Sequence, residues 1–164
     1  MQRRHALSLL GGLSLAGCGF RLRGSERLPR YPLLVRGQVG ATAMALIARL
    51  RDGDQSVWLS GDPQAPAVVE HVLVILQDDR QRVVQGSNAS GLVRELNLQL
   101  RFRWTLLDDQ SQEIIAPQDM MVDQDMSYNE SAALGKSEEE NALFQVLQDR
   151  VVRNTISRLS RVKP

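Results

Sequence analysis

Cysteine, histidine and aromatic residues are scarce in this chain of 164 residues. A single cysteine excludes an intrachain disulfide and a cysteine-rich zinc site. The two histidines, His5 and His71, offer little to a histidine-dependent enzyme. Because aromatic residues make up only 4% of the chain, the core must consist mainly of aliphatic side chains and methionine. A net charge of +1 gives no basic field that would favour nucleic acid as a partner.

Motifs of catalysis are also missing. The sequence contains no nucleophile elbow, phosphate-binding loop, dinucleotide fingerprint or zinc-protease pattern. The glycine- and serine-rich segment 86–91 is interpreted as a flexible turn, since no helix is expected to follow it. Acidic residues between positions 119 and 130 have the composition of a metal site, but their alternation and basic neighbours favour solvated pairs. The sequence therefore predicts no enzyme, no cofactor and no metal ion.

The first 17 residues have the composition of a secretory signal. Arg3 and Arg4 precede a short apolar segment at residues 6–16. This segment is too short to cross a bilayer as a helix, which needs about 20 residues. A glycine pair within it disfavours the alternative of a buried helix. The paired arginines leave a twin-arginine signal as an alternative, but the surrounding residues fit that pattern poorly, and ordinary secretion is favoured.

The signal ends in Leu15-Ala16-Gly17-Cys18, which is the pattern of a bacterial lipobox. Small residues allow a peptidase to cleave before Cys18, whose thiol accepts a diacylglycerol and whose freed amine is then acylated. The alternative is a free or buried thiol. Three acyl chains on Cys18 would give stable anchoring, since one chain alone binds a membrane only marginally. Gly19 stands where an aspartate would indicate retention in the inner membrane, and resemblance to bacterial lipoproteins in general therefore implies the outer membrane, on its periplasmic side.

Length and signal together predict the domain organisation. Residues 1–17 are expected to be a signal peptide, and residues 18–164 a single domain with an N-terminal lipid anchor. A domain of about 150 residues buries roughly two-thirds of its chain surface, which is enough for a stable core.

Hydrophobic patterning predicts five strands, at residues 31–36, 57–59, 68–77, 92–107 and 113–128. The third is nearly continuous valine, leucine and isoleucine, which suits the centre of a sheet. The fourth carries the clearest pattern, with apolar residues at even positions and polar ones between them. An antiparallel return of the fifth would place acidic side chains beside basic ones, bringing Asp119, Asp123 and Asp125 near Arg101 and Arg103.

Two helices complete the predicted fold. Residues 42–51 show helical spacing, and Gly53 is expected to end this helix, because glycine commonly follows the last helical residue. A C-terminal helix is expected to begin at a capping box of Ser137 and Glu140. Its apolar stripe is typical of a core face and comprises Phe144, Leu147, Val151, Thr155, Leu159 and Val162. The predicted fold is α+β, a two-layer sandwich of two helices on a mostly antiparallel sheet of four to five strands.

Two stretches carry a family resemblance. Residues 18–24, CGFRLRG, resemble the start of the mature LPS-assembly lipoprotein family LptE, where LPS is lipopolysaccharide. Residues 128–136, YNESAALGK, lead into an acidic start and a long C-terminal helix, as in that family. The resemblance implies an outer-membrane lipoprotein that sits as a plug inside the LPS-transport β-barrel LptD. Members assist assembly of the barrel and bind LPS as it enters the outer leaflet.

The resemblance also implies which residues bind LPS. Lys136 falls where the family carries a lysine before its last helix, and we expect an exposed cation directly before the Ser137 cap. Arginine forks and lysine charges suit the phosphates of LPS. The further candidates flank the turn at residues 86–91 and are Arg80, Arg82 and Arg94. Their alternative role is as solvated surface charge, and the basic residue that the family carries in this turn has no clear counterpart here.

Two other classes of function stay open from the sequence. One is a free-standing outer-membrane lipoprotein with a structural or ligand-carrying role. The weaker alternative is a periplasmic hydrolase with unrecognised carboxylates. Co-purification separates them from the first hypothesis, since only a plug should be isolated together with a large β-barrel protein.

Overall fold

The computed structural model describes residues 28–129 and 133–162. Its strands are β1 (Leu33–Gly37), β2 (Val57–Leu59), β3 (Val72–Ser87), β4 (Val93–Leu107) and β5 (Glu113–Ser127). Its helices are α1 (Ala41–Asp52) and α2 (Ala133–Leu159). The signal peptide, the lipobox with Cys18, and residues 18–24 lie outside the described residues. No helix among those described has the length and apolar character needed to cross a membrane.

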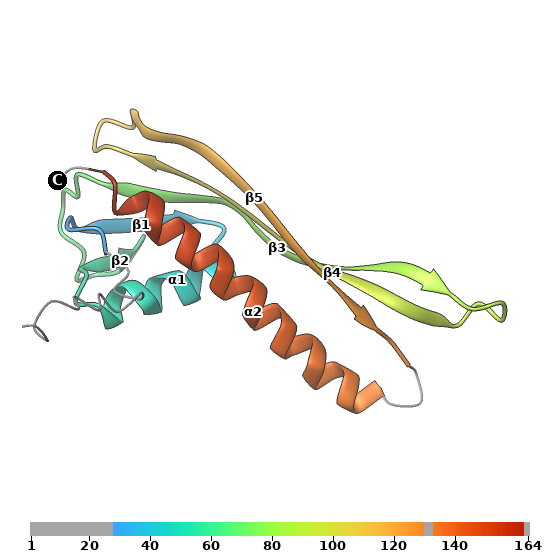
Figure 1. Ribbon diagram of the computed structural model, residues 1–164. Coiled ribbons are helices and arrows are strands. Elements are labelled where there is room, and N and C mark those ends of the chain that lie inside the picture. The colour runs from blue at the N-terminus through green and yellow to red at the C-terminus, as the bar shows by residue number, and fades with distance from the viewer. Residues whose placement is uncertain (1–27, 130–132, 163–164) are drawn as a thin grey trace, which may run out of the picture.

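The five strands form one sheet in the order β2-β1-β3-β4-β5. Strand β1 runs parallel to β2 and to β3, while β3, β4 and β5 are antiparallel to their neighbours. Both helices pack on the same face of the sheet, and the long helix α2 runs beside the antiparallel strands (Figure 1). The predicted α+β fold, with two helices on a mostly antiparallel sheet, is confirmed.

The core lies between the sheet and the helices, where sequence periodicity placed it. Every even position of β4 from 96 to 106 is buried, at 0–4% exposure, which confirms the alternation. The stripe on α2 is buried against it, with Val162 only partly so. Since side chains alternate between the two faces of a strand, the odd positions of β4 form the outer face of the sheet. The elements therefore present one packed face and one polar face.

Strand β3 differs from the predicted segment 68–77 at both ends. It lies at the sheet centre as expected, but it starts at Val72 and continues to Ser87. The added half is mostly polar and exposed, so it has no apolar alternation to detect. Backbone pairing with β4 holds it instead. The turn therefore lies at residues 88–92, where the Asn88 side-chain oxygen accepts hydrogen bonds from the backbone N–H groups of Ser90 and Leu92.

The predicted capping box at the start of α2 is wrong. The helix begins at Ala133, so Ser137 and Glu140 lie within it. Alanine and leucine have high helix propensity and extend the helix upstream of the serine. Lys136 consequently belongs to the first turn of α2 instead of preceding its cap.

A distant carboxylate caps helix α1. Its N-cap residue, Gly40, has no side chain to accept a hydrogen bond. The Asp78 Oδ2 atom, on β3, accepts one from the Ala43 N–H at 2.9 Å. A Cβ atom at Gly40 would lie 2.7 Å from the Asp78 side chain, so glycine makes room for this contact. The cap fixes α1 to the centre of the sheet.

Candidate functional site

The β3–β4 hairpin is the part of the molecule that extends furthest from the core. Its turn at residues 88–92 reaches beyond β5 and away from α2 (Figure 1). Strand β5 ends where Ser127 pairs with Glu95, so the last residues of the hairpin have no third strand beside them. The Arg94 carbonyl accepts a hydrogen bond from the Tyr128 N–H at 2.8 Å, at the place where β5 ends.

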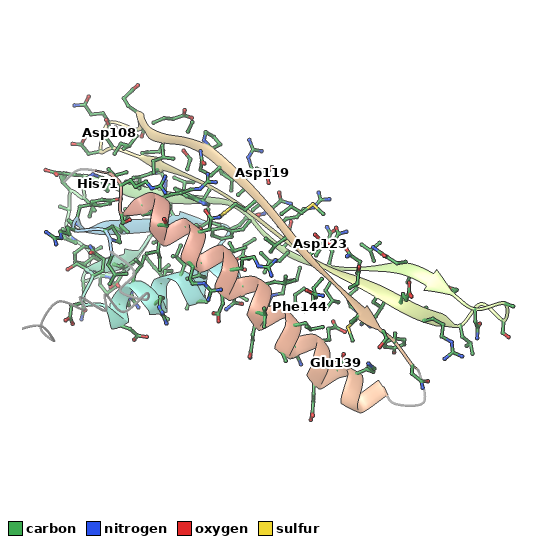
Figure 2. The ribbon with its side chains drawn as sticks, viewed as in Figure 1. His71, Asp108, Asp119, Asp123, Glu139 and Phe144 are labelled. Atoms are coloured by element: carbon green, nitrogen blue, oxygen red, sulfur yellow. The ribbon has the colours of Figure 1, made fainter. Side chains whose placement is uncertain are left out.

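Two of the predicted arginines lie against α2. Arg80 pairs with Leu100, and Arg82 pairs with Leu98. Directly paired residues project from the same face of a sheet, so both arginines share the face that the helices cover. The Arg80 guanidinium donates to the Gln148 side-chain oxygen on α2 and lies 5.3 Å from the centre of the Phe144 ring. Figure 2 shows the place of Phe144 on α2.

Arg82 and Lys136 each contact a carboxylate of α2. The Arg82 Nε atom is 3.3 Å from Glu140 Oε2, and the Arg82 side chain is 53% exposed. Lys136 Nζ donates to Glu139 Oε2 at 2.6 Å and to Ser127 Oγ at 3.3 Å. The Lys136 side chain is only 18% exposed, so the expected exposed cation is instead a partly buried one held by an ion pair.

The structure places three of the four predicted basic residues along α2. We call Arg80, Arg82 and Lys136 the basic cluster, since all three contact side chains of α2 or its first turn. Arg94 lies near Lys136 at the end of β5, because it precedes Glu95, whose cross-strand partner Ser127 accepts a hydrogen bond from Lys136 Nζ. Arg80 and Arg82 lie some way before the turn that they were expected to flank.

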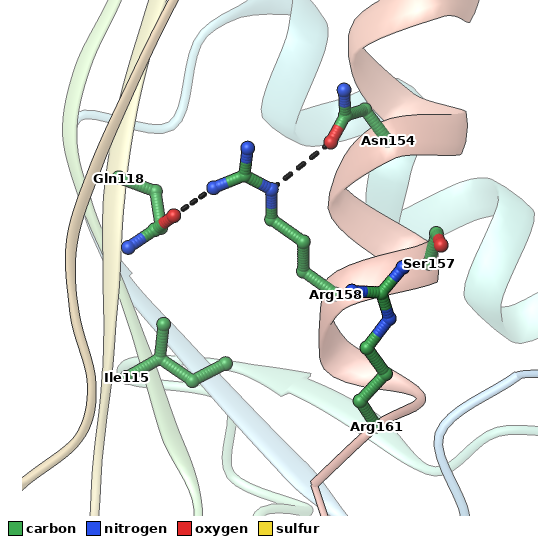
Figure 3. Close-up of a pocket in the computed structure, with 6 residues that line it drawn as sticks. All are labelled: Ile115, Gln118, Asn154, Ser157, Arg158 and Arg161. Atoms are coloured by element: carbon green, nitrogen blue, oxygen red, sulfur yellow. Dashed lines mark hydrogen bonds between the residues drawn. The ribbon is translucent and has the colours of Figure 1, made fainter.

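Sequence reasoning missed a second basic region, at the other end of α2. An open pocket of about 410 Å³ lies between β5 and the end of the helix, lined by Ile115, Gln118, Asn154, Ser157, Arg158 and Arg161. The Arg158 Nε atom donates to Asn154 Oδ1 at 3.0 Å, and its Nη1 atom donates to Gln118 Oε1 (Figure 3). The sequence shows these arginines only as polar positions beside the apolar stripe, with no sign that β5 lies opposite.

The outer face of the sheet carries a polar network across β4 and β5. Asn97, only 2% exposed, donates through Nδ2 to Asp123 Oδ2 at 3.0 Å and to Asp125 Oδ1 at 2.7 Å. Asp119 pairs with Arg103, as predicted. The expectation of a nearby arginine is wrong for Asp125, which lies opposite Asn97, whereas Asp123 lies opposite Gln99 and is the diagonal neighbour of Arg101 on the same face. The Asn97 amide donates to both carboxylates.

Two further observations bear on catalysis and metals. The described residues contain no group of three or more histidine, cysteine or acidic side chains that could hold a metal ion. His71 is buried and stacked on Tyr31, with ring centroids 4.0 Å apart. Burial lowers the pKa of His71, and the Glu70 carboxylate opposes this in part. This packing is that of a core histidine.

Solved structures of several lipoproteins resemble this fold. Lipoprotein B from Nitrosomonas europaea, described as uncharacterized, is 23% identical with a TM-score of 0.66 over 87% of this chain and 90% of that one. A minor lipoprotein from Acinetobacter baumannii is 15% identical with a TM-score of 0.62, over 84% and 99%. The rare lipoprotein B from Shewanella oneidensis is 20% identical with a TM-score of 0.56, over 74% and 87%. At these identities the likeness establishes the fold alone.

Comparison of sequences identifies the family. No curated protein sequence matches the chain. The family model described as LptE, lipopolysaccharide-assembly, matches residues 36–159, which span every element from the end of β1 to the end of α2. Because this match covers well over half of the chain, the chain belongs to the LptE family, whose members are non-enzymatic lipoproteins of LPS assembly.

Proposed function

We propose that this chain is an outer-membrane lipoprotein that plugs the LPS-transport barrel LptD, helps it to assemble, and binds LPS during insertion into the outer leaflet. The family match over residues 36–159 is the observation that carries this proposal. The lipobox supports removal of residues 1–17 and acylation of Cys18, which would anchor residues 18–164 on the periplasmic side.

The surface of the sheet supports a place inside a barrel. The lumen of a large outer-membrane barrel is polar and holds water, so a plug needs polar outer surfaces. The network of Asn97, Asp123 and Asp125 lies on the uncovered face of the sheet. Figure 2 shows Asp119 and Asp123 along β5, on the far side of the strands from most of α2. A water-filled lumen would keep the carboxylates of this face solvated, which avoids the cost of burying charge.

The basic cluster supports LPS binding. Phosphate groups prefer arginine forks and lysine charges, and both residue types occur here on adjacent elements. Glu139 and Glu140 hold Lys136 and Arg82, so carboxylates occupy the positions that phosphate oxygens of a ligand would take. LPS would therefore bind by displacing these internal carboxylates. Arg94 lies closer to the hairpin turn and would extend the basic surface in that direction.

Replacement of Lys136 tests the LPS site. The mature chain would be purified from cells in detergent, and the LPS retained per chain would be measured together with the thermal midpoint. We expect Lys136→Asp to lower retained LPS severalfold while the midpoint falls by only a few degrees, because the ion pair with Glu139 contributes at most about 1 kcal/mol. Lys136→Arg is the matched control and should retain LPS. Unchanged LPS in Lys136→Asp would remove this residue from the site.

A further inference from the structure

The pocket between β5 and the end of α2 is separate from the basic cluster. Arg158 is 22 residues along the helix from Lys136. At about 1.5 Å per residue this is a distance of about 33 Å. The pocket is open and has a volume of about 410 Å³. None of the described residues that line it is acidic, so two arginines share it without a carboxylate among the lining side chains.

Arg158 is held in position before any ligand binds. Its Nε and Nη1 groups donate to Asn154 and Gln118, one on its own helix and one on β5 (Figure 3). A guanidinium carries five N–H donors. The bonds to Asn154 and Gln118 use two of them, so the other N–H groups can donate to a ligand. Because the Arg158 side chain is already ordered, binding an anion there costs less side-chain conformational entropy.

Arg161 brings a second positive charge to the same pocket. Its side chain lines the pocket together with the Ser157 side chain. The carbonyl end of the helix dipole compensates only part of this charge. A phosphate would compensate it more fully, since several oxygens can accept from both guanidinium groups and from the serine hydroxyl at once.

The N-terminal part of the domain lies at this same end of the molecule. The Tyr31 hydroxyl donates to the Leu159 carbonyl at 2.8 Å, one residue from Arg158. Leu28 packs against the core and lies ten positions after Cys18 in the sequence. Ten extended residues span at most about 33–36 Å. A chain anchored through Cys18 would therefore keep the pocket near the membrane surface, and a tether of this length gives an effective concentration on the order of millimolar.

We propose that Arg158 and Arg161, with Ser157, bind the phosphate of a lipid headgroup in the leaflet that holds the anchor. The inference rests on the proposed acylation of Cys18. Binding there fixes the end of α2 at the level of the headgroups, with the β3–β4 hairpin at the opposite end of the molecule (Figure 1). A weak site suffices, because the anchor supplies the high local concentration of headgroups.

The test uses the full acylated chain in lipid nanodiscs. The Nε–Hε signals of the arginine side chains would be recorded by NMR, and Arg158→Gln and Arg161→Gln would assign them. Discs that contain phosphatidylglycerol would be compared with discs of phosphatidylcholine alone, and with the latter plus inorganic phosphate. We expect phosphatidylglycerol to shift the Arg158 and Arg161 signals. Arg161→Gln should reduce the shift at Arg158 at least fivefold, whereas Arg153→Gln, on the same helix but outside this pocket, should not change it.

Three results would overturn the inference. One is the absence of a shift with phosphatidylglycerol. Another is an equal shift at Arg153, which would indicate attraction to the whole basic surface. The third is an equal shift with inorganic phosphate, which would indicate a site for free phosphate only. The intact mass of the chain separates these from failure of the anchor, since a chain without acyl mass refutes the acylation of Cys18 itself.

Discussion

Neutralising Glu140 or Glu139 should strengthen LPS binding, although these residues are acidic and LPS is anionic. Glu140 Oε2 lies 3.3 Å from Arg82 Nε, and Glu139 Oε2 accepts from Lys136 Nζ at 2.6 Å. If LPS phosphates bind Arg82 and Lys136, they must first displace these carboxylates. Glu140→Gln and Glu139→Gln keep the side-chain shape but remove the competing charge.

The expected gain in LPS affinity can be worked out from the exposure of the side chains in the two ion pairs. Exposed ion pairs contribute about 0.2–1 kcal/mol. In each pair one side chain is shielded, Glu140 at 17% and Lys136 at 18% exposure, which favours the upper end of that range. Since 1.4 kcal/mol corresponds to a tenfold change, about 1 kcal/mol corresponds to a gain of about fivefold in LPS affinity per substitution. The free energy of unfolding should fall by no more than the same amount.

A titration with fluorescently labelled LPS would measure these affinities. Glu138→Gln is the matched control, because it removes the same charge from the same turn of α2 and Glu138 makes no ion pair with any described residue. The LPS affinity of Glu140→Gln should be severalfold higher than that of this control. Arg82→Gln should bind LPS more weakly than the unmodified chain. An affinity of Glu140→Gln no higher than that of Glu138→Gln would refute competition between Glu140 and LPS.

Three stability measurements test the fold. Asp78→Ala removes the cap of α1 and should lower the free energy of unfolding in denaturant by about 1 kcal/mol; no loss would show that the contact does not stabilise the helix. Gly37→Ala should cost more than about 2 kcal/mol, because Gly37 has φ +99° and a Cβ there would lie 2.1 Å from the Ile75 carbonyl oxygen. Burial lowers the pKa of His71, so the unfolded chain binds the proton more readily and stability should fall as the pH drops below about 6.5. In His71→Phe the free energy of unfolding should fall less steeply below this pH. An unchanged pH profile in this variant would contradict a role for His71 in the loss of stability.

The sequence predicts those parts of the fold in which a buried face produces a regular pattern of apolar residues. Strand β4 alternates strictly because one face packs on the helices, and α2 carries a continuous apolar stripe for the same reason. The second half of β3 has no such pattern, because pairing with β4 holds it and its side chains stay mostly exposed. The capping-box pattern of Ser137 and Glu140 predicts too late a start for α2, because alanine and leucine before the serine have high helix propensity and extend the helix.

The features that the sequence did not predict depend on contacts between residues that are distant in the chain. Asp78 caps a helix 35 residues away, and no local pattern marks it. Residue type alone identified the basic candidates, but the side chains that hold Arg80, Arg82 and Lys136 come from α2 and depend on its packing angle. The pocket at Arg158 needs Gln118 of β5, so it exists only once the sheet and the helix are assembled.

Photo-crosslinking in living cells tests the central claim, that the chain occupies the lumen of the LPS-transport barrel. A photoreactive amino acid would replace Gln64, in the turn after β2, or Ala89, in the hairpin turn, with the full chain still carrying Cys18. The account predicts a light-dependent adduct with the barrel protein from at least one position, and co-purification of the barrel without irradiation. No adduct from either position, in cells whose LPS export depends on the substituted chain, would contradict the lumenal placement.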